Sequence, residues 1–369
     1  MTAWKQWNVA ITSMNARPDN PTPGCAVARC LREEAGFTGR IIGLGYETLE
    51  SGFYLHPENS ASFLLPYPAT GSEALMERLD EILEVEPLDA IIPCLDTELP
   101  NFIALEPDLA RRGIRLCLPS REQLRQRDKD RLPDLCQAAG ISTPAVRHVT
   151  DESFFDSADK ELSWPLMVKG LFYEAYVTHT AEEAKARFRQ LTAQWGYPVL
   201  VQPFIKGNEV NLVALGDGEG GLLGAVMMRK QAVTDKGKAW AGVAIDDREL
   251  LAAAQKLMAI LHWHGPFELE MLRDEEGRLH LIEINPRFPA WVYLSHGVGR
   301  NLPAALLAHM QGVPAEQLNF APPSPGTHFI RYAEEVIVPL DDIAEMSQVG
   351  QRTAPQNIRA LRVIASRKQ

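Results

Sequence analysis

The first 120 or so residues alternate short apolar, β-branched runs with segments of helical character. The apolar runs are NVAITS, GRIIGLG, DAIIPC and IRLCLP, and helices are predicted between them over residues 26–34, 73–83 and 99–112. Strands and helices that alternate at this spacing are joined by right-handed crossovers and build a parallel sheet. The pattern predicts a Rossmann-like α/β domain over residues 1–122. In sheets of this kind, ligands bind at the carboxyl ends of the strands.

Polar side chains follow two of these predicted strands. Ser13, Asn15 and Arg17 come after the first strand, and Asp96 and Glu98 come after DAIIPC. They are either ligand-binding groups at the sheet edge or ordinary helix caps and turn formers, and the sequence leaves both interpretations open.

The remainder of the chain changes character after a helical link over residues 121–140. Strands PAVRHV, WPLMVKG, EAYVTH and PVLVQPF, with one helix ending near residue 194, predict a small α+β subdomain with its linker helix over residues 123–205. Antiparallel strands NEVNLVALGD, GGLLGAVMMRK and KAWAGVAI, a hairpin ending in IEINPRF, and strands near THFIRYA and EVIVPL predict a larger subdomain over residues 206–369.

Helix starts are marked by a cap residue followed three positions later by Glu or Gln. The four pairs are Thr70 with Glu73, Ser120 with Gln123, Thr180 with Glu183, and Asp246 with Glu249.

Composition narrows the function classes. The chain has 46% hydrophobic and 23% charged residues, which is an ordinary globular mixture. Its 37 basic and 48 acidic side chains give a net charge of −11, which argues against a nucleic-acid partner. The five cysteines form no CxxC pair and no apolar run is long enough to span a bilayer, so we expect a cytoplasmic protein without a membrane partner.

The hairpin that ends in IEINPRF brings oxygen ligands together. Alternate residues of a strand share a face, so Glu283, Asn285 and, across the hairpin, Glu270 can point into one cavity. Glu268 lies on the same face as Glu270 and competes for its role. Hard oxygen ligands without His or Cys suit Mg²⁺, with Mn²⁺ as the alternative ion. Two solvated glutamates that never meet are the other interpretation.

Two further segments point to a nucleotide. LVQPFIKGNEV breaks a strand at Pro203 and Gly207, which exposes main-chain groups that could read an adenine edge, and Glu209 could accept from ribose hydroxyls. Lys129 in RDKDR and Lys169 at the end of WPLMVKG could meet an anion. The alternatives are an ordinary strand-to-strand turn and lysines that reach solvent.

His262 and His264 alternate in LHWHG in the way metal ligands sometimes do. No third ligand is spaced with them, so we interpret them as a helix-to-strand turn.

The order and spacing of these weak signals resemble the ATP-grasp superfamily over almost the whole chain. IEINPRF is similar to the metal-binding segment of the carbamoyl phosphate synthetase and biotin carboxylase branch. The resemblance implies an ATP-grasp fold, with the N-terminal domain as its preceding α/β domain, a small α+β lid and a larger antiparallel subdomain.

The resemblance also implies a nucleotide site. Lys129 and Lys169 would contact the ATP phosphates, with Lys169 also near the adenine. Gln202 stands where a glutamate usually meets the adenine amino group. The hinge residues Pro203, Phe204 and Ile205 would hold the base, through the Pro203 carbonyl and the Ile205 amide.

The remaining roles concern ribose, metal and acyl donor. Glu209 matches the ribose-binding acid, and Glu270, Glu283 and Asn285 match the ligands of two Mg²⁺ ions. Arg287 matches a catalytic basic residue that steadies the carboxylate or acyl phosphate.

One departure from the family concerns the glycine-rich flap that usually follows the strand-end lysine. The chain reads GLFYEAYVTHT there, and only Gly170 remains. Either another loop covers the phosphates, with Lys236 and Lys238 of TDKGK as the candidate, or turnover is slow or absent. TDKGK is otherwise a solvated basic turn.

The resemblance implies an ATP-dependent carboxylate ligase that forms an acyl phosphate, releases ADP and joins the acyl group to an amine. Its partners would be ATP, a small-molecule or peptide carboxylate and an amine acceptor, and the family suggests a homodimer. The alternatives are a catalytically weak or inactive ATP-binding regulatory protein and a phosphotransferase with a stable product.

Overall fold

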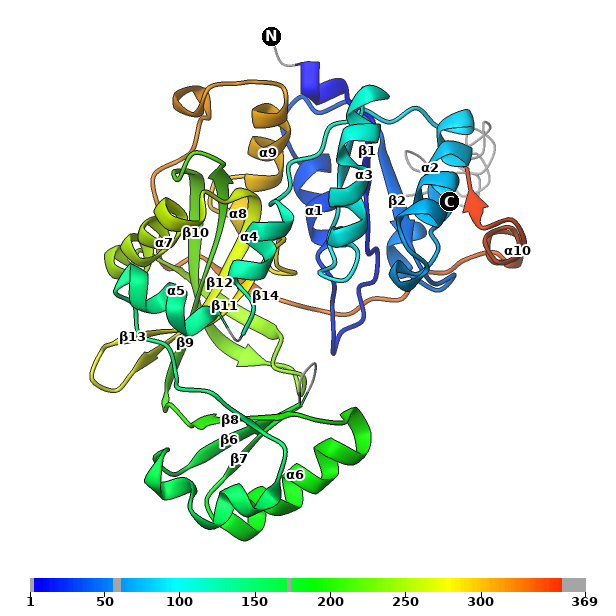
Figure 1. Cartoon of the computed structure of the whole chain (residues 1–369). Helices are drawn as coiled ribbons and strands as arrows, with labels where there is room; N and C mark the ends of the chain where they lie inside the picture. The colour runs from blue at the N-terminus through cyan, green and yellow to red at the C-terminus, as the bar shows by residue number, and fades with distance from the viewer. Residues whose placement is uncertain (1–2, 56–60, 130, 171–173, 354–369) are drawn as a thin grey trace, which may run out of the picture. The chain divides into compact units, whose positions relative to one another are not determined.

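The computed structural model of the chain confirms the parallel N-terminal sheet (Figure 1). Its strands are β1 (Val9–Ile11), β2 (Ile41–Gly45), β3 (Ser62–Leu64), β4 (Ala90–Ile92) and β15 (Gln351–Arg352). In the order β15-β3-β2-β1-β4, all neighbours are parallel except β15, which runs antiparallel to β3. Every residue of β1, β2 and β4 is buried, as a sheet covered on both faces requires.

Helices cover both faces of this sheet. They are α1 (Gly24–Arg32), α2 (Ser72–Val85) and α3 (Leu99–Arg111). Val9 and Ile11 of β1 join the hydrophobic cluster of α1, whereas Ala10 joins that of α2 and α3. The alternation of side chains along β1 therefore divides the core between the two faces.

The largest sheet has six strands in the order β13-β12-β9-β10-β11-β14. These are β9 (Gly207–Asp217), β10 (Leu222–Val233), β11 (Ala239–Ile245), β12 (His264–Asp274), β13 (Leu279–Asn285) and β14 (His328–Ile330). The accompanying helices are α7 (Arg248–Leu261), α8 (Tyr293–Gly297) and α9 (Leu302–Met310), whereas α10 (Leu340–Val349) packs against β15 of the N-terminal sheet. Helix α1 packs against α8 and α9, which joins the N-terminal core to the core under α9.

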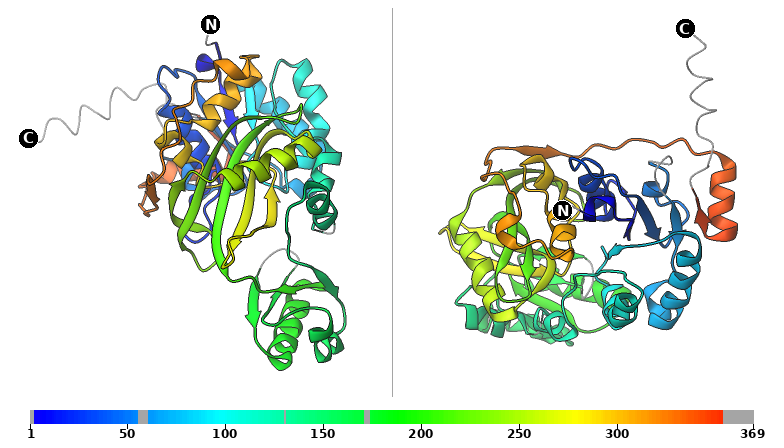
Figure 2. Two further views of the ribbon diagram at one scale, coloured as in Figure 1. Left: turned by 90° about the vertical axis from the view of Figure 1, so that its left-hand side faces the viewer. Right: turned by 90° about the horizontal axis from the view of Figure 1, so that it is seen from above.

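A four-stranded antiparallel sheet has the order β5-β8-β6-β7. Its strands are β5 (Arg147–Val149), β6 (Leu166–Lys169), β7 (Ala175–Thr178) and β8 (Val199–Pro203). Helix α6 (Ala181–Trp195) packs along β6, β7 and β8 (Figures 1 and 2). This sheet and α6 have a hydrophobic core of their own, as predicted for a small α+β unit.

The structure describes residues 3–55, 61–129, 131–170 and 174–353. The chain forms two compact units: unit 1 comprises residues 1–125, 212–268 and 285–369, and unit 2 comprises residues 126–211 and 269–284. The predicted division into segments 1–122, 123–205 and 206–369 remains a prediction. Among the described residues, no helix has the length and apolar character that crossing a bilayer requires.

Some predicted elements are wrong. EVIVPL forms no strand, and Ile337 is 93% exposed, because a β-branched run without a neighbouring strand has nothing to pair with. IRLCLP contributes only an isolated bridge, from Arg115 to Ala90. The link over residues 121–140 is two helices, α4 (Arg121–Gln126) and α5 (Leu132–Ala139), and Gly140 ends the second in a left-handed conformation.

Two of the four predicted caps are confirmed. Ser120 and Gln123 bond reciprocally, and Thr180 Oγ1 accepts from the Glu183 amide. The other two predictions are wrong. Gly71 precedes α2 in place of Thr70, and Asp247 caps α7 one residue after the predicted Asp246.

A confirmed cap and a failed one predict different stabilities. Thr180→Ala removes an acceptor for a helical amide and should lower the free energy of unfolding by about 1 kcal/mol. Thr70→Ala removes only an exposed hydrogen bond to the Tyr67 carbonyl, so it should cost clearly less. Chemical denaturation of both variants checks this, and equal losses would contradict the assignment.

Candidate functional site

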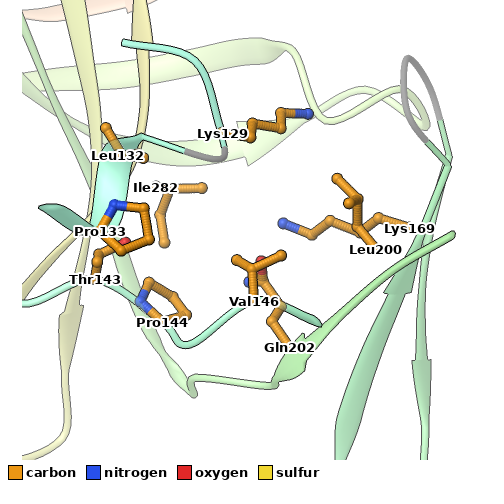
Figure 3. Close-up of a pocket in the computed structure, with 10 residues that line it drawn as sticks. All are labelled: Lys129, Leu132, Pro133, Thr143, Pro144, Val146, Lys169, Leu200, Gln202 and Ile282. Carbon is orange, nitrogen blue, oxygen red and sulfur yellow. The ribbon is translucent and has the colours of Figure 1, made fainter. Parts of the chain in front are cut away.

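A pocket within unit 2 collects both predicted lysines and Gln202 (Figure 3). It contains about 430 Å³ of space, including the part open to solvent. Figure 3 shows the side chains of Lys129 and Lys169 extending into this space from opposite sides. The lining residues are Lys129, Leu132, Pro133, Thr143, Pro144, Val146, Lys169, Leu200, Gln202 and Ile282. Two cationic groups above a largely apolar lining can accept a ligand with an anionic and an apolar part.

Lys169 is the last residue of β6, where its neighbours across the sheet are Ala175 and Leu200. Burial lowers the pKa of its ammonium group, and the positive charge of Lys129 lowers it further. Without a bound ligand, the protein therefore disfavours the charged form of Lys169. An anion bound between the two lysines would relieve this cost.

Three carboxylates oppose that shift. Glu283 on β13, Glu270 on β12 and Glu209 on β9 each raise the pKa of Lys169 through their negative charge. The sequence prediction that Glu270 and Glu283 act near one another is consistent with their shared influence on Lys169. With Lys129, these five groups carry three negative and two positive charges, so the set can still take up a cation. Carboxylate oxygens are suitable ligands for Mg²⁺.

The strand break predicted at Pro203 is present. Strand β8 ends at Pro203, the Phe204 amide donates to the Pro165 carbonyl at 2.8 Å, and β9 begins at Gly207. A Cβ atom at Gly207 would lie 2.3 Å from the Arg273 carbonyl oxygen, so β12 approaches this point too closely for any other residue. Ile205 is half-buried between these two fixed points.

Asn285 is oriented by a buried neighbour within unit 1. Its Nδ2 donates to Glu268 Oε2 at 3.0 Å, and Trp291 Nε1 donates to Glu268 Oε1 at 2.6 Å. Glu268 is only 4% exposed and each of its oxygens is engaged. Glu268 thus serves to orient Asn285, while Glu270 is the more accessible of the two competing glutamates.

Arg287 is held by a residue that sequence reasoning did not connect with it. Its Nε donates to Asp96 Oδ1 at 2.8 Å, and its other nitrogens donate to the Phe288 carbonyl and Asn285 Oδ1. Asp96 follows β4, so one of the polar residues at the carboxyl ends of the parallel strands does belong to the candidate site. Its position after a strand was the sequence signal that marked Asp96 as a candidate. The sequence could not reveal its partner, because Arg287 is 191 residues away.

Glu98 follows the same strand and is structural. It is 1% exposed and accepts hydrogen bonds from Thr12, Tyr46 and the amides of Cys94 and Leu95. Burial raises the pKa of this carboxyl group. The turn-forming interpretation holds for Glu98.

The flap region is partly described. The Gly170 amide donates to the Glu174 carbonyl at 3.1 Å, and residues 171–173 of the predicted flap lie outside the described residues. In TDKGK, Lys236 forms an exposed ion pair with Asp19 at 2.7 Å, and Thr234 donates to the Asp19 carbonyl. This turn is therefore bonded to the segment after β1 within unit 1.

Comparison with known sequences gives one family match and distant relatives. Residues 197–333 match the family model described as ATP-grasp in the biosynthetic pathway with Ter operon. A D-alanine–D-alanine ligase from Nitrosospira multiformis is 30% identical over 177 residues, which are 43% of this chain and 56% of that protein. The large chain of carbamoyl phosphate synthase from Clostridium beijerinckii is 24% identical over 173 residues, which are 43% of this chain and 16% of that protein. The chain thus spans about half of one relative and about a sixth of the other.

Comparison with solved structures identifies the fold. A biotin carboxylase–β,γ-ATP complex from Campylobacter jejuni aligns with a TM-score of 0.63 at 17% identity, covering 88% of this chain and 75% of that one. The resemblance predicted from the sequence is confirmed: residues 197–333 match an ATP-grasp family model, and the chain has an ATP-grasp fold.

Proposed function

We propose that the chain is an ATP-dependent ligase that activates a carboxylate as an acyl phosphate and joins it to an amine. The observation that carries this proposal is the arrangement around Lys169. Half-buried Lys169 lines one pocket with a second lysine, and three carboxylates from three different strands act on it electrostatically. This arrangement suits a polyphosphate with its metal ions.

In this proposal, unit 2 binds the nucleotide. Lys129 and Lys169 neutralise the phosphates from the two sides of the pocket, and Gln202 meets the adenine amino group with its side-chain oxygen. The Pro203 carbonyl and the Ile205 amide hydrogen-bond the adenine edge, with Phe204 between them. Glu209 accepts from the ribose hydroxyls.

Glu270, Glu283 and Asn285 would hold two Mg²⁺ ions, or Mn²⁺ in their place. The fit rests on the chemistry of these donors, which are all oxygen, and on the hydrogen bond that turns the Asn285 amide nitrogen toward Glu268. The bound ions would withdraw charge from the phosphate oxygens. Lys169 interacts electrostatically with the same carboxylates, and its positive charge would also withdraw charge from the phosphate oxygens.

Arg287 would orient the donor carboxylate. One carboxylate oxygen attacks the γ-phosphorus, the bond from that phosphorus to the β–γ bridging oxygen breaks, and ADP leaves with that electron pair. The amine then attacks the acyl carbon, phosphate leaves and the amine loses a proton to solvent, which gives an amide. Such phosphoryl transfer depends on positioning and charge stabilisation, so the protein needs no covalent nucleophile.

A second candidate is a nucleotide-binding regulatory protein with little or no turnover. It is favoured by Gly170, the remaining flap glycine, whose amide already donates to Glu174. That amide is then not offered to a phosphate.

A thermal-shift titration with ATP, ADP and GTP, with and without Mg²⁺, tests the proposed site. At about 100 times its dissociation constant a ligand should add roughly 2.7 kcal/mol of stability. We expect an adenine-selective, Mg²⁺-dependent shift, followed by ADP release when carboxylates and amines are added. A shift without ADP release under any combination would support the regulatory protein, and no shift would contradict both.

Asp96 should act as a positioning residue for Arg287. Asp96→Asn keeps the size of the side chain but weakens its hold on the guanidinium, so kcat should fall about ten- to 100-fold. The nucleotide-induced thermal shift and the melting temperature should stay unchanged. The matched control is Asp108→Asn, which alters an exposed ion pair with Arg111 on α3 and should leave kcat unchanged. Equal kcat in both variants would remove Asp96 from the site.

A further inference from the structure

Three metal-ligating side chains from distant segments meet within unit 1, whereas the pocket of the proposed nucleotide site is formed by unit 2. They are Cys117, which follows α3, His264, the first residue of β12, and His309 near the end of α9. Their ligating atoms all lie within 4.8 Å of one another. Cys117 Sγ lies 3.3 Å from His264 Nε2, and the two imidazole rings meet edge to face at 6.0 Å.

The backbone fixes this meeting point. Gly265 has φ +97°, and a Cβ atom there would lie 2.3 Å from the Cys117 carbonyl oxygen. Only glycine allows the start of β12 to lie so close to Cys117. The packing of these two backbone segments therefore holds Cys117 and His264 close together, independently of any interaction between their side chains.

The hydrogen bonds prepare His264 to act as a ligand. Its Nδ1 lies 3.2 Å from the Leu118 carbonyl oxygen, which can only accept, so Nδ1 carries the proton. The lone pair of Nε2 then faces the Cys117 sulfur. A carbonyl that accepts from the other ring nitrogen and so fixes the tautomer is typical of histidines that bind metals.

The other two ligands are also shielded from solvent. Cys117 is 3% exposed, and His309 is half-buried. A buried thiol of this kind is a poor nucleophile, which argues against a Cys–His catalytic pair.

The surrounding charge is negative. Glu106 on α3 acts electrostatically on both Cys117 and His264, and Asp217 at the end of β9 acts on His309. These carboxylates would stabilise a divalent cation, and a water molecule could complete its coordination.

We infer that Cys117, His264 and His309 form a binding site for a transition-metal ion of the Zn²⁺ class. One thiolate and two imidazoles are a common donor set for Zn²⁺. Ideal tetrahedral geometry places such donor atoms about 3.3–3.6 Å apart. The Cys117–His264 pair already has this spacing, and the third ligand would need to close by at most about 1.5 Å. The inference does not depend on the proposed function.

The test is a Co²⁺ titration of the full-length protein after chelator treatment, followed by competition with Zn²⁺. We expect one equivalent of Co²⁺ to give the intense visible bands of a tetrahedral ion and a near-ultraviolet thiolate-to-cobalt charge-transfer band. Zn²⁺ should displace the cobalt, and it should raise the melting temperature of the metal-free protein by a few degrees.

Two variants remove ligands in distinguishable ways. Cys117→Ser should abolish the charge-transfer band, while His309→Gln should retain it only at higher Co²⁺ concentrations. Each should weaken Zn²⁺ binding by more than about tenfold, because the loss of a group that only hydrogen-bonds a ligand already costs about 10- to 100-fold. If Cys117→Ser does not fold, His309→Gln still tests the site.

The matched controls are His262→Asn and Cys136→Ser. His262 ends α7 in a left-handed conformation that asparagine tolerates, and Cys136 lies in unit 2. Both variants should bind Co²⁺ like the unaltered chain. Binding without a charge-transfer band, or equal binding by the unaltered chain, Cys117→Ser and His309→Gln, would overturn the inference and leave a thiol–imidazole hydrogen bond.

Discussion

Glu283→Gln should reduce ADP formation at least about 100-fold. The substitution keeps the shape of the side chain but removes a negative charge that acts electrostatically on Lys169 and that we propose as a metal ligand. Removing one group that stabilises charge in a transition state typically costs 100- to 1,000-fold in rate. ADP release under saturating Mg²⁺ and ATP measures the effect, and excess Mg²⁺ should recover only part of it.

The control for this variant is Glu275→Gln. Glu275 lies in the turn after β12 and forms an exposed ion pair with Lys206 at 2.6 Å, so the same chemical change there should leave the rate unchanged. If Glu283→Gln retains full activity, the assignment of Glu283 as a metal ligand is wrong.

Lys169→Met should abolish the nucleotide-induced thermal shift without destabilising the ligand-free protein. Burial and Lys129 lower the pKa of Lys169 below its unfolded value, so the unfolded chain binds this proton more tightly than the folded protein does. Its charge therefore costs stability at neutral pH, and stability should rise as pH increases through the lowered pKa toward 10.5. Removing the charge in the absence of Mg²⁺ should keep or raise the melting temperature and flatten this pH dependence.

The loss of function has a separate cause. Without Lys169 the phosphates lose a cationic partner, so ADP formation should fall about 100- to 1,000-fold. Lys206→Met removes an exposed lysine from the hinge and should keep both the shift and the rate. A lower melting temperature for ligand-free Lys169→Met, together with a retained nucleotide shift, would show that Lys169 is structural.

The sequence was sufficient to predict the architecture where its signals are local. Alternating apolar runs predicted the parallel sheet, and cap pairs predicted the starts of α4 and α6. It failed where local patterns are ambiguous. Asp246 and Asp247 are equally good caps, and only the folded backbone selects the second. Strands as short as β3 and β15 carry too few residues to show a period.

The candidate site was predictable to the extent that its residues follow a recognisable order along the chain. Lys129, Lys169 and Gln202 do line one pocket, and Glu209, Glu270 and Glu283 do act together on Lys169. Their individual roles remain proposals.

Contacts between distant segments were not predictable. The bond from Asp96 to Arg287 joins residues 191 positions apart. The turn predicted for His262 and His264 is confirmed, since α7 ends at Leu261 and β12 begins at His264. The two further ligands that His264 meets, Cys117 and His309, come from other segments, so no spacing rule could have found them.

The central claim is that the protein phosphorylates a carboxylate, and hydroxylamine trapping tests it most directly. The protein would be incubated with ATP, Mg²⁺ and pooled carboxylates, with hydroxylamine in place of the amine. We expect hydroxamate and ADP in equal amounts, because hydroxylamine captures an acyl phosphate. ADP formation with a stable phosphorylated product and no hydroxamate would contradict the claim and identify a phosphotransferase.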